Sequence, residues 1–212
     1  MKENNNQYVL SRRQKVYLPF KRVFDILFSF LFILILSPLF IILSICVLID
    51  THGFPIFRQR RIGRNNKEFI MVKFRSMNVK APHDTPTHLL IDPFQYMSKF
   101  GRFIRRTSLD ELPQLFNILI GNMSFIGPRP ALWCQDDLIE ERNSNNVQIL
   151  RPGLSGYAQT HGRDELEIPK KVEFDTYYLK NIGIWLDIKI LFISIGKALT
   201  GENVSEGSNE NK

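Results

Sequence analysis

GRFIRRTSLDELPQLFNILIGNMSFIGPRP, residues 101–130, combines adjacent carboxylates with an arginine cluster and a proline-stiffened loop. Apolar residues recur at helical spacing through its middle, and Pro113 is tolerated only in a first helical turn. We therefore expect a helix to begin here. Asp110 or a neighbour is its expected N-cap, or, in a competing register, Ser108 and Glu111 form a capping box. Either register places Asp110 and Glu111 at the positive end of a helix, which favours ionised carboxylates.

The adjacent acids have two interpretations. Helix capping alone explains an isolated Asp-Glu pair. Here Arg105 precedes the pair, and Arg129 follows it between two prolines that restrict the backbone. A rigid arginine suits bidentate contact with phosphate, and a carboxylate can act as a nucleophile or bind Mg²⁺. The combination indicates phosphoryl-transfer chemistry.

Composition narrows the class of protein. The length of 212 residues and the 44% hydrophobic content suit one domain. The formal charge of +7 fits an anionic partner, which is a nucleic acid, a phospholipid surface or a phosphorylated substrate. Two cysteines and four scattered histidines give no disulfide framework and no metal-binding motif. A P-loop or dinucleotide-binding Rossmann domain lacks its glycine-rich phosphate cradle.

Residues 26–49, ILFSFLFILILSPLFIILSICVLI, form an apolar run whose length as a helix is about 36 Å, enough to cross a bilayer. Basic residues flank both ends, and positive charge marks the cytoplasmic side. Ser37-Pro38 breaks the run near its middle. We therefore expect a re-entrant helical hairpin, with an ordinary kinked transmembrane helix as the alternative. Asp25, at the entrance, is expected near the lipid headgroups.

The next two segments have simple signatures. Residues 55–77 predict two short strands joined by a turn at 62–66. Residues 81–93 read as a proline-broken connection.

The remaining chain is less uniform. A short polar helix is expected at 135–142, and a charged helix at 170–180. Between them, RPGLSGYAQ at 151–159 is a tight loop that either brings backbone close to a ligand or turns a corner. Residues 182–199 predict an apolar helix interrupted by Asp187 and Lys197, which is either interfacial or buried in the core.

Five motifs carry a resemblance to a known family: KFRSM at 73–77, RRTSLDELPQLFN at 105–117, MSFIGPRP at 123–130, RPGLSGYAQ at 151–159 and DTYYL at 175–179. From about residue 19 to residue 200 the chain resembles the bacterial sugar transferases, the small monotopic polyprenyl-phosphate phosphoglycosyl transferases. It is most similar to members that act in capsule or exopolysaccharide assembly.

With the residue patterns, the resemblance leads us to expect an α+β, mostly helical single domain. A polar and basic tail covers 1–18, and the re-entrant membrane helix 19–50 is broken at Ser37-Pro38. A membrane-associated catalytic domain with interfacial amphipathic helices covers 51–200. The last residues, 201–212, are polar and expected to be disordered.

The reaction that the resemblance implies is transfer of a sugar 1-phosphate from a UDP-sugar to polyprenyl (undecaprenyl) phosphate, with release of UMP. Asp110 would be the nucleophile, forming a covalent phosphosugar intermediate, and would bind Mg²⁺, while Glu111 would assist the acceptor or orient the metal. The expected substrate-binding and phosphate-binding residues are Arg105, Arg129, Asp175, Lys73, Arg75 and Arg163. From its sequence context alone, Asp175 reads as an ordinary surface acid.

The expected partners are the UDP-sugar, the polyprenyl phosphate and membrane phospholipid, at the cytoplasmic face of the bacterial inner membrane. A nucleic acid is not expected, because the basic residues lie beside the membrane segment without interleaved aromatics. A homo-oligomer stays open. Two alternative functions also stay open, a lipid-pyrophosphate hydrolase and a non-catalytic basic membrane adaptor.

Overall fold

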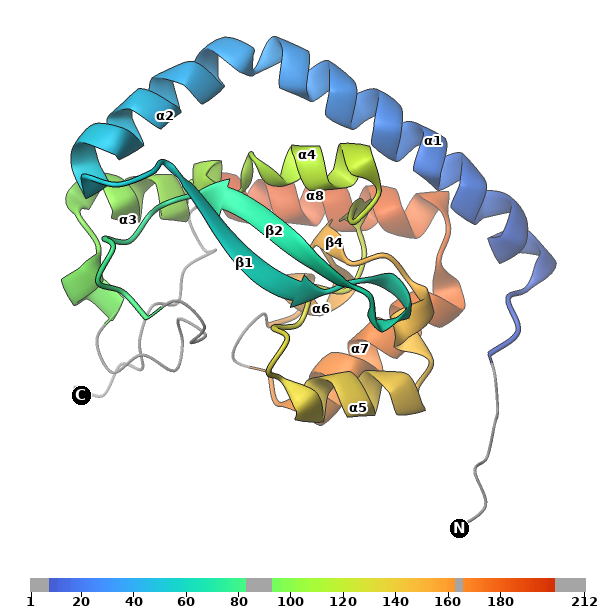
Figure 1. The fold of residues 1–212 in the computed structure, drawn as a ribbon. Coiled ribbons are helices and arrows are strands. Elements are labelled where there is room, and N and C mark those ends of the chain that lie inside the picture. The colour runs from blue at the N-terminus through green and yellow to red at the C-terminus, as the bar shows by residue number, and fades with distance from the viewer. Residues whose placement is uncertain (1–7, 83–92, 163–165, 201–212) are drawn as a thin grey trace.

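The computed structural model describes residues 8–82, 93–162 and 166–200 (Figure 1). The described residues form a mostly helical single domain, as the sequence predicts. They contain two small sheets, of which the sequence predicts only the first. Its helices and strands are α1 Arg12–Ile35, α2 Ser37–Thr51, β1 Ile56–Ile62, β2 Glu68–Phe74, α3 Lys99–Arg106, α4 Gln114–Ile120, β3 Ser124–Ile126, α5 Asp136–Ser144, β4 Gly153–Ser155, α6 Tyr157–Thr160, α7 Ile168–Asn181 and α8 Ile184–Thr200. Short 3₁₀ turns connect several of them, including Leu109–Glu111 before α4.

Helices α1 and α2 form an arch over the rest of the domain (Figure 1). Their axes differ by 65°, and the bend lies at the predicted break. Pro38 lies in the first turn of α2, where its missing N–H is not needed, and the Ser37 hydroxyl donates to the Leu34 carbonyl at 2.8 Å. Of the helices that the structure describes, none alone has both the length and the apolar character to cross a membrane; α1 and α2 meet these criteria only as a bent pair.

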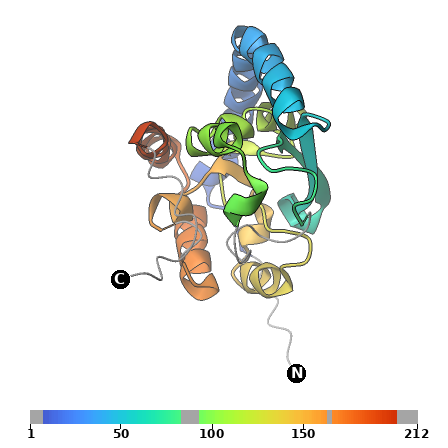
Figure 2. The same cartoon turned by 90° about the vertical axis from the view of Figure 1, so that its left-hand side faces the viewer.

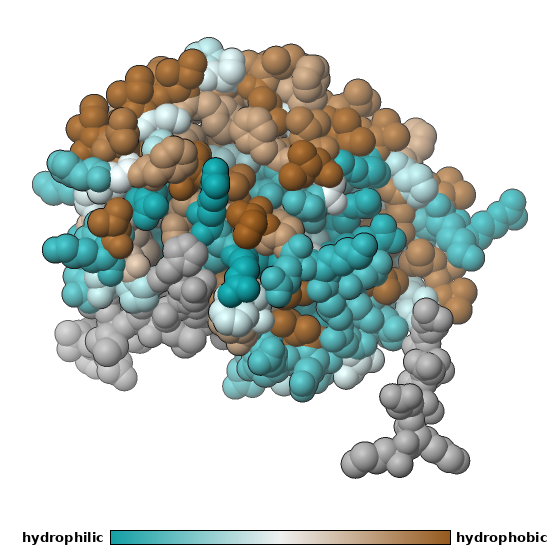
Figure 3. Space-filling model, in the orientation of Figure 1, coloured by the Kyte–Doolittle hydropathy of each residue, from teal (hydrophilic) through white to brown (hydrophobic). Residues whose placement is uncertain are grey.

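Helix α1 begins earlier than residue 19. Ser11 caps it through a capping box with Gln14, so residues from Arg12 onward, which read as part of a polar tail, are helical. Pro19 lies inside the helix. The outer surface of the arch is apolar, as the brown surface of Figure 3 shows. Large exposed side chains there include Phe24, Leu27, Leu31, Ile35, Ile41, Ile45 and Leu48.

Polar groups fasten the inner side of α1 to the domain. Asp25 is buried, and its carboxylate accepts hydrogen bonds from the Ser124 hydroxyl and the Phe125 amide, both at 3.1 Å. Strand β3 thus supplies donors that satisfy the buried carboxylate. The expectation that Asp25 lies near headgroups stays a prediction. One turn earlier, Arg22 donates to the carbonyls of Ile118 and Leu119 at the end of α4.

Strands β1 and β2 form the predicted antiparallel hairpin, in register from Ile56 opposite Phe74 to Ile62 opposite Glu68. Helix α4 packs on this hairpin. The Asn117 side chain donates to the Ile70 carbonyl at 2.7 Å and accepts from the Val72 amide at 3.0 Å. This amide replaces a neighbouring strand at the β2 edge and fixes α4 against it.

Strands β3 and β4 pair in parallel and carry the glycine-rich loops. A Cβ added at Gly127 would lie 2.3 Å from the Arg151 carbonyl oxygen, and one at Gly156 would lie 2.3 Å from the Gly127 oxygen. The glycines of RPGLSGYAQ thus allow two backbone segments to touch. This packing favours the corner-turning interpretation of the loop.

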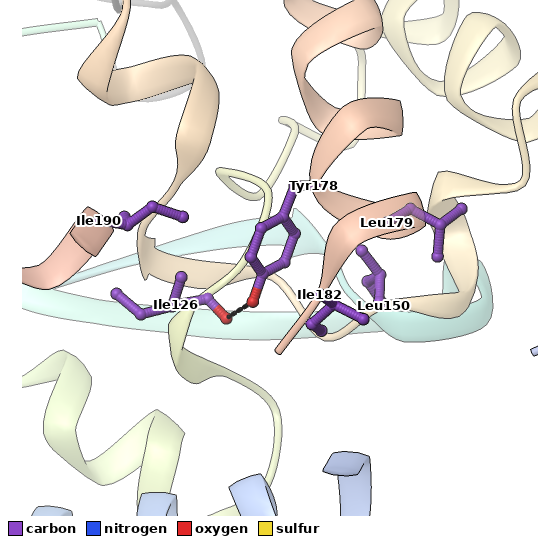
Figure 4. Close-up of a cluster of buried hydrophobic side chains, with 6 residues drawn as sticks. All are labelled: Ile126, Leu150, Tyr178, Leu179, Ile182 and Ile190. Carbon is purple, nitrogen blue, oxygen red and sulfur yellow. Dashed lines mark hydrogen bonds between the residues drawn. The ribbon is translucent and has the colours of Figure 1, made fainter. Parts of the chain in front are cut away.

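A buried cluster beneath these strands joins β3 to α7 and α8 (Figure 4). Tyr178 is 1% exposed, and its hydroxyl contacts the Ile126 carbonyl at 3.3 Å. The predicted charged helix is confirmed as α7, and its buried face includes Val172, Tyr178 and Leu179.

Helix α8 contributes only part of one face to this core. Ile190 is buried, but Trp185 is 76% exposed and Phe192 is 70% exposed. The alternative of a fully buried core helix is therefore wrong. Most of the connection at 81–93, and both chain ends beyond residues 8 and 200, lie outside the described residues.

Candidate active site

Asp110 lies in a 3₁₀ turn, Leu109–Glu111, that precedes α4. Ser108 adopts a left-handed conformation (φ 56°) that turns the chain out of α3, and its side chain makes no capping hydrogen bond within the described chain. Helix α4 begins only after Pro113. Ser108 is the N-cap of the 3₁₀ turn but forms no capping box, and Pro113, not Asp110, is the N-cap of α4. The physical reason is Pro113, which lacks the amide N–H needed to continue the helical hydrogen bonds. It divides the helical stretch into a 3₁₀ turn and α4.

The Asp110 carboxyl is 5% exposed and faces charge from three other segments. Burial is the largest influence on its pKa and Glu111 the second, and both raise it; the cations Lys73, Arg105 and Arg129 lower it. The result is a pKa of about 7. The expectation that a helix terminus favours the ionised form is therefore wrong for the protein alone, because desolvation outweighs the positive charges.

Lys73 projects from β2 toward this carboxylate. Burial lowers the pKa of its ammonium to about 8; the nearby Asp110 raises it, and Arg105, Arg61 and Arg129 lower it further. The ammonium also lies 5.3 Å from the centre of the Phe57 ring. A lysine of this kind exchanges protons near neutral pH and keeps its charge when an anion binds.

Glu111 and Arg129 form an ion pair across the site, with 3.4 Å between Oε1 and Nη1. Arg129 is held from its backbone side as well, because the Arg142 guanidinium donates to its carbonyl at 2.9 Å. The proline-flanked loop thus presents a half-exposed guanidinium beside two carboxylates. An incoming phosphate can contact this arginine without breaking the backbone contact.

Asp175 reaches the site through Arg142. Its Oδ2 accepts from Arg142 Nε at 3.0 Å and Nη2 at 2.7 Å, and the carboxylate is 1% exposed. Burial raises the pKa of Asp175, and the guanidinium opposes this effect. The interpretation of Asp175 as a surface acid is wrong. It orients Arg142, which in turn supports the loop of Arg129.

Arg142 was not among the predicted site residues. The signal in the sequence is its spacing, because it follows Leu138 by four residues and so shares the buried side of α5. A basic residue on a buried helix face requires an acidic partner. The sequence does not say which acid that is.

The other predicted residues that the structure describes make contacts that do not involve the two carboxylates. The Arg75 Nε donates to the Phe54 carbonyl at 3.0 Å, and its guanidinium lies 5.8 Å from the Phe57 ring centre. Ser37 and Pro38 lie at the bend of the arch. Arg163 lies outside the described residues. The structure therefore brings together Lys73, Arg105, Asp110, Glu111 and Arg129.

Among the described residues, no group of three or more His, Cys, Asp and Glu side chains is arranged to hold a metal ion. The carboxylates of Asp110 and Glu111 adjoin each other in the chain. A Mg²⁺ ion that takes one or two carboxylates and completes its shell with substrate phosphates and water is compatible with this donor set.

The sequence model of the family described as "Bacterial sugar transferase" matches residues 16–201. The chain belongs to the bacterial sugar transferase family. The matched range includes the arch from residue 16 onward, both sheets and every described residue of the site.

This bacterial sugar transferase has relatives in several bacteria. It is 40% identical over 210 residues to an "Uncharacterized sugar transferase" of Haemophilus influenzae, covering 92% of this chain and 43% of that protein. It is 37% identical over 187 residues to the "Uncharacterized sugar transferase EpsL" of Bacillus subtilis, covering 88% of this chain and 90% of EpsL. It is also 40% identical over 200 residues to the "Undecaprenyl-phosphate galactose phosphotransferase" of Salmonella typhimurium, covering 86% of this chain.

The share of each relative that this chain covers varies widely. It spans nearly all of EpsL, but 43% of the Haemophilus protein and 40% of the Salmonella protein.

Proposed function

We propose that this protein transfers a sugar 1-phosphate from a UDP-sugar to polyprenyl phosphate, releasing UMP, and so begins a lipid-linked glycan for a capsule, an exopolysaccharide or a related polymer. The observation that carries the proposal is the buried Asp110 carboxyl with Lys73, Arg105 and Arg129 around it. The printed name of the Salmonella relative, an undecaprenyl-phosphate galactose phosphotransferase, supports the same chemistry.

The first step uses Asp110 as a nucleophile. One carboxylate oxygen forms a bond to the β-phosphorus of the UDP-sugar, and the bond from that phosphorus to the oxygen of UMP breaks, so UMP leaves with the electron pair. Desolvation makes the carboxylate a stronger nucleophile, and surrounding cations stabilise the added charge of the diphosphate. Arg129 is suited to hold phosphate oxygens because its loop is fixed by Arg142.

The second step returns Asp110 to its starting state. A phosphate oxygen of the acceptor attacks the same phosphorus, and the phosphorus–Asp110 bond breaks to regenerate the carboxylate. The product is a polyprenyl diphosphate sugar. When the acceptor phosphate arrives with a proton, Glu111 is positioned beside the nucleophile to accept it.

Magnesium is part of the proposal. Asp110, with Glu111 beside it, would hold the ion together with the diphosphate oxygens. Bound there, Mg²⁺ supplies positive charge that stabilises a leaving UMP. The remaining charge compensation comes from the three cations of the site.

The membrane location is also a proposal. The apolar outer surface of the arch fits the hydrocarbon of a bilayer, and the 65° bend fits a segment that returns to its own side. The exposed Trp185 and Phe192 of α8 suit the headgroup boundary. The site would then lie at the cytoplasmic face of the inner membrane, where a soluble nucleotide sugar and a lipid phosphate can both reach it.

The deciding experiment omits the acceptor. Wild-type protein with UDP-sugar and Mg²⁺ should release roughly one equivalent of UMP and gain the mass of a phosphosugar. A panel of UDP-sugars identifies the donor. The Asp110→Asn protein should neither release UMP nor gain this mass. The Glu111→Gln protein should form the adduct and transfer it to the lipid slowly. If UMP appears only after lipid phosphate is added, direct displacement replaces the covalent mechanism.

The same assay separates the alternatives. A lipid-pyrophosphate hydrolase releases free phosphate instead of a lipid-linked sugar. If the protein is a membrane adaptor, the wild-type and Asp110→Asn proteins bind vesicles equally well, and neither of them releases UMP.

A further inference from the structure

A cavity of about 200 Å³ lies between α4 and α8, next to the site. In Figure 1 α4 and α8 overlap below the arch, and Figure 2, turned by 90°, shows α8 nearly end-on to one side of it. The apolar part of the cavity lining consists of Leu112, Leu115, Phe125, Leu154, Leu191 and Ile195, with Ala198 at its end. We call this space the α4–α8 cavity. A cavity of about 150 Å³ is known to hold a benzene ring, so this one has room for a branched five-carbon isoprene unit.

Polar groups converge on the same cavity from β4, α6 and α8. The Gln159 side chain is one of them, and the residue is 8% exposed. Within the described residues, its buried Oε1 atom has no hydrogen-bond partner. An amide can offer its oxygen to a donor or turn its NH₂ toward an anion. A buried amide of this kind destabilises the fold unless a ligand or water completes its hydrogen bonds.

The remaining polar groups are suited to an anion. Lys197 lines the cavity and donates one hydrogen bond, to the Thr160 carbonyl at 3.0 Å. An ammonium has three donors, so this contact leaves capacity for a ligand. The hydroxyls of Ser155 and Ser194 lie against each other at the cavity wall. A cation, two hydroxyls and an amide together form a donor set for phosphate.

The apolar lining is continuous with the outside of α8. Leu191 and Ile195 line the cavity and yet are 41% and 47% exposed. Their neighbour Phe192 is 70% exposed. A lipid chain can therefore leave the cavity between these residues without its carbon atoms meeting water. A sugar would instead place hydroxyls against six apolar side chains that cannot satisfy them.

We propose that the α4–α8 cavity binds the acceptor, with the phosphate of polyprenyl phosphate on Lys197, Gln159 and the two serines and its first isoprene unit between α4 and α8. This inference rests on the proposed transfer reaction. Glu111 also lines the cavity and directly follows Asp110 in the chain. The acceptor phosphate therefore approaches the phosphosugar from the side of Glu111, and the donor occupies the side of Lys73, Arg105 and Arg129.

The test separates the two half-reactions. Ser194→Leu fills the cavity, and Gly196→Leu is the matched control on the same helix, because a Cβ added at Gly196 meets no described atom within 4 Å. Ser194→Leu should form the phosphosugar adduct at the wild-type rate but transfer it to undecaprenyl phosphate about tenfold more slowly or worse. Gly196→Leu should match wild type in both steps. Lys197→Met should raise the KM for the lipid and leave that for the UDP-sugar unchanged.

Two results overturn the assignment. If folded Ser194→Leu protein no longer forms the adduct, the cavity binds the donor. If this variant transfers the phosphosugar at the normal rate, the cavity binds neither substrate. A photoreactive isoprenyl phosphate gives an independent readout that needs no turnover. It should label residues 190–198, and undecaprenyl phosphate but not phosphatidylglycerol should compete. Labelling elsewhere, or competition by both lipids, contradicts the proposal. If wild type forms no adduct, the covalent mechanism fails, and the labelling result still decides the binding site.

Discussion

The Lys21 ammonium on α1 donates a 2.6 Å hydrogen bond to the Asp187 carboxylate on α8, although 166 residues separate the two. The hydroxyls of Tyr17 and Tyr178 donate to the same carboxylate, each at 2.7 Å. All four groups are largely withdrawn from solvent. The Asp187 carboxylate thus joins α8 to the arch through Lys21 and Tyr17, and to α7 through Tyr178.

Removing Asp187 should strongly destabilise the domain. Asp187→Leu leaves the Lys21 ammonium, whose side chain is 11% exposed, without its counter-charge. We expect a loss of about 3–5 kcal/mol in the free energy of unfolding. The control is Glu173→Leu, which breaks the exposed Lys170–Glu173 pair and should cost less than about 1 kcal/mol. Denaturant titrations in one detergent measure both, and equal losses would contradict the assigned role.

Alkaline pH should weaken the same region through Tyr178. Burial raises the pKa of its phenol well above the usual value, and the nearby Asp187 raises it further. Above about pH 10 the unfolded chain ionises this phenol while the folded chain keeps the proton, so stability falls as pH rises. Tyr178→Phe should lack this part of the loss. The profile of unfolding free energy against pH measures the difference between the two proteins.

Arg142 should affect the rate of turnover by positioning Arg129, without contacting the substrate itself. Arg142→Met removes the support of the Arg129 carbonyl and leaves Asp175 buried without its cation. A misplaced Arg129 should lower kcat/KM by about tenfold to a hundredfold. Arg64→Met is the control, since Arg64 also donates to a backbone carbonyl, that of Ile149, but away from the site. Steady-state kinetics on folded protein would refute the idea if both variants kept wild-type activity.

Both ends of the arch should be cytoplasmic. In a chain whose Cys46 and Cys134 are replaced by serine, Asn5→Cys and Arg60→Cys should both be protected from an impermeant thiol reagent in intact cells. Pro38→Leu restores a continuous helix, and position 5 should then become reachable from outside. Labelling of only one position in the chain with native Pro38 would establish a spanning helix instead.

Chelation should stop turnover. The diphosphate of the donor needs charge compensation beyond Lys73, Arg105 and Arg129, so excess chelator should abolish UMP release and added Mg²⁺ should restore it. Chelator should leave the unfolding midpoint unchanged, because the ion is held jointly with substrate. Full activity in chelator would remove the metal from the proposal.

Local signals predicted several of the elements, but not α3, the β3–β4 pair or α6, and long-range contacts determined the chemistry of the site. The break at Ser37-Pro38, the β1–β2 hairpin and α7 follow from apolar periodicity and from turn-forming or helix-breaking residues. The start of α4 was predicted too early, because capping patterns do not reveal that Pro113 interrupts the helical hydrogen bonds. The pKa of Asp110 depends on Lys73, some forty residues away in the chain, and on burial, which sequence spacing does not report. The Asp175–Arg142 pair was missed for the same reason.

The distance in sequence between Lys21 and Asp187 has a consequence for biosynthesis. At about 5–20 residues per second, a ribosome needs roughly 8–33 s to add the 166 residues between them. During that interval α1 has left the exit tunnel, but the acid that receives its lysine has not been translated. The apolar arch is complete long before this partner exists. Insertion into lipid would therefore precede tertiary folding, and the nascent arch would hold the growing chain at the membrane until α8 emerges and locks the two together.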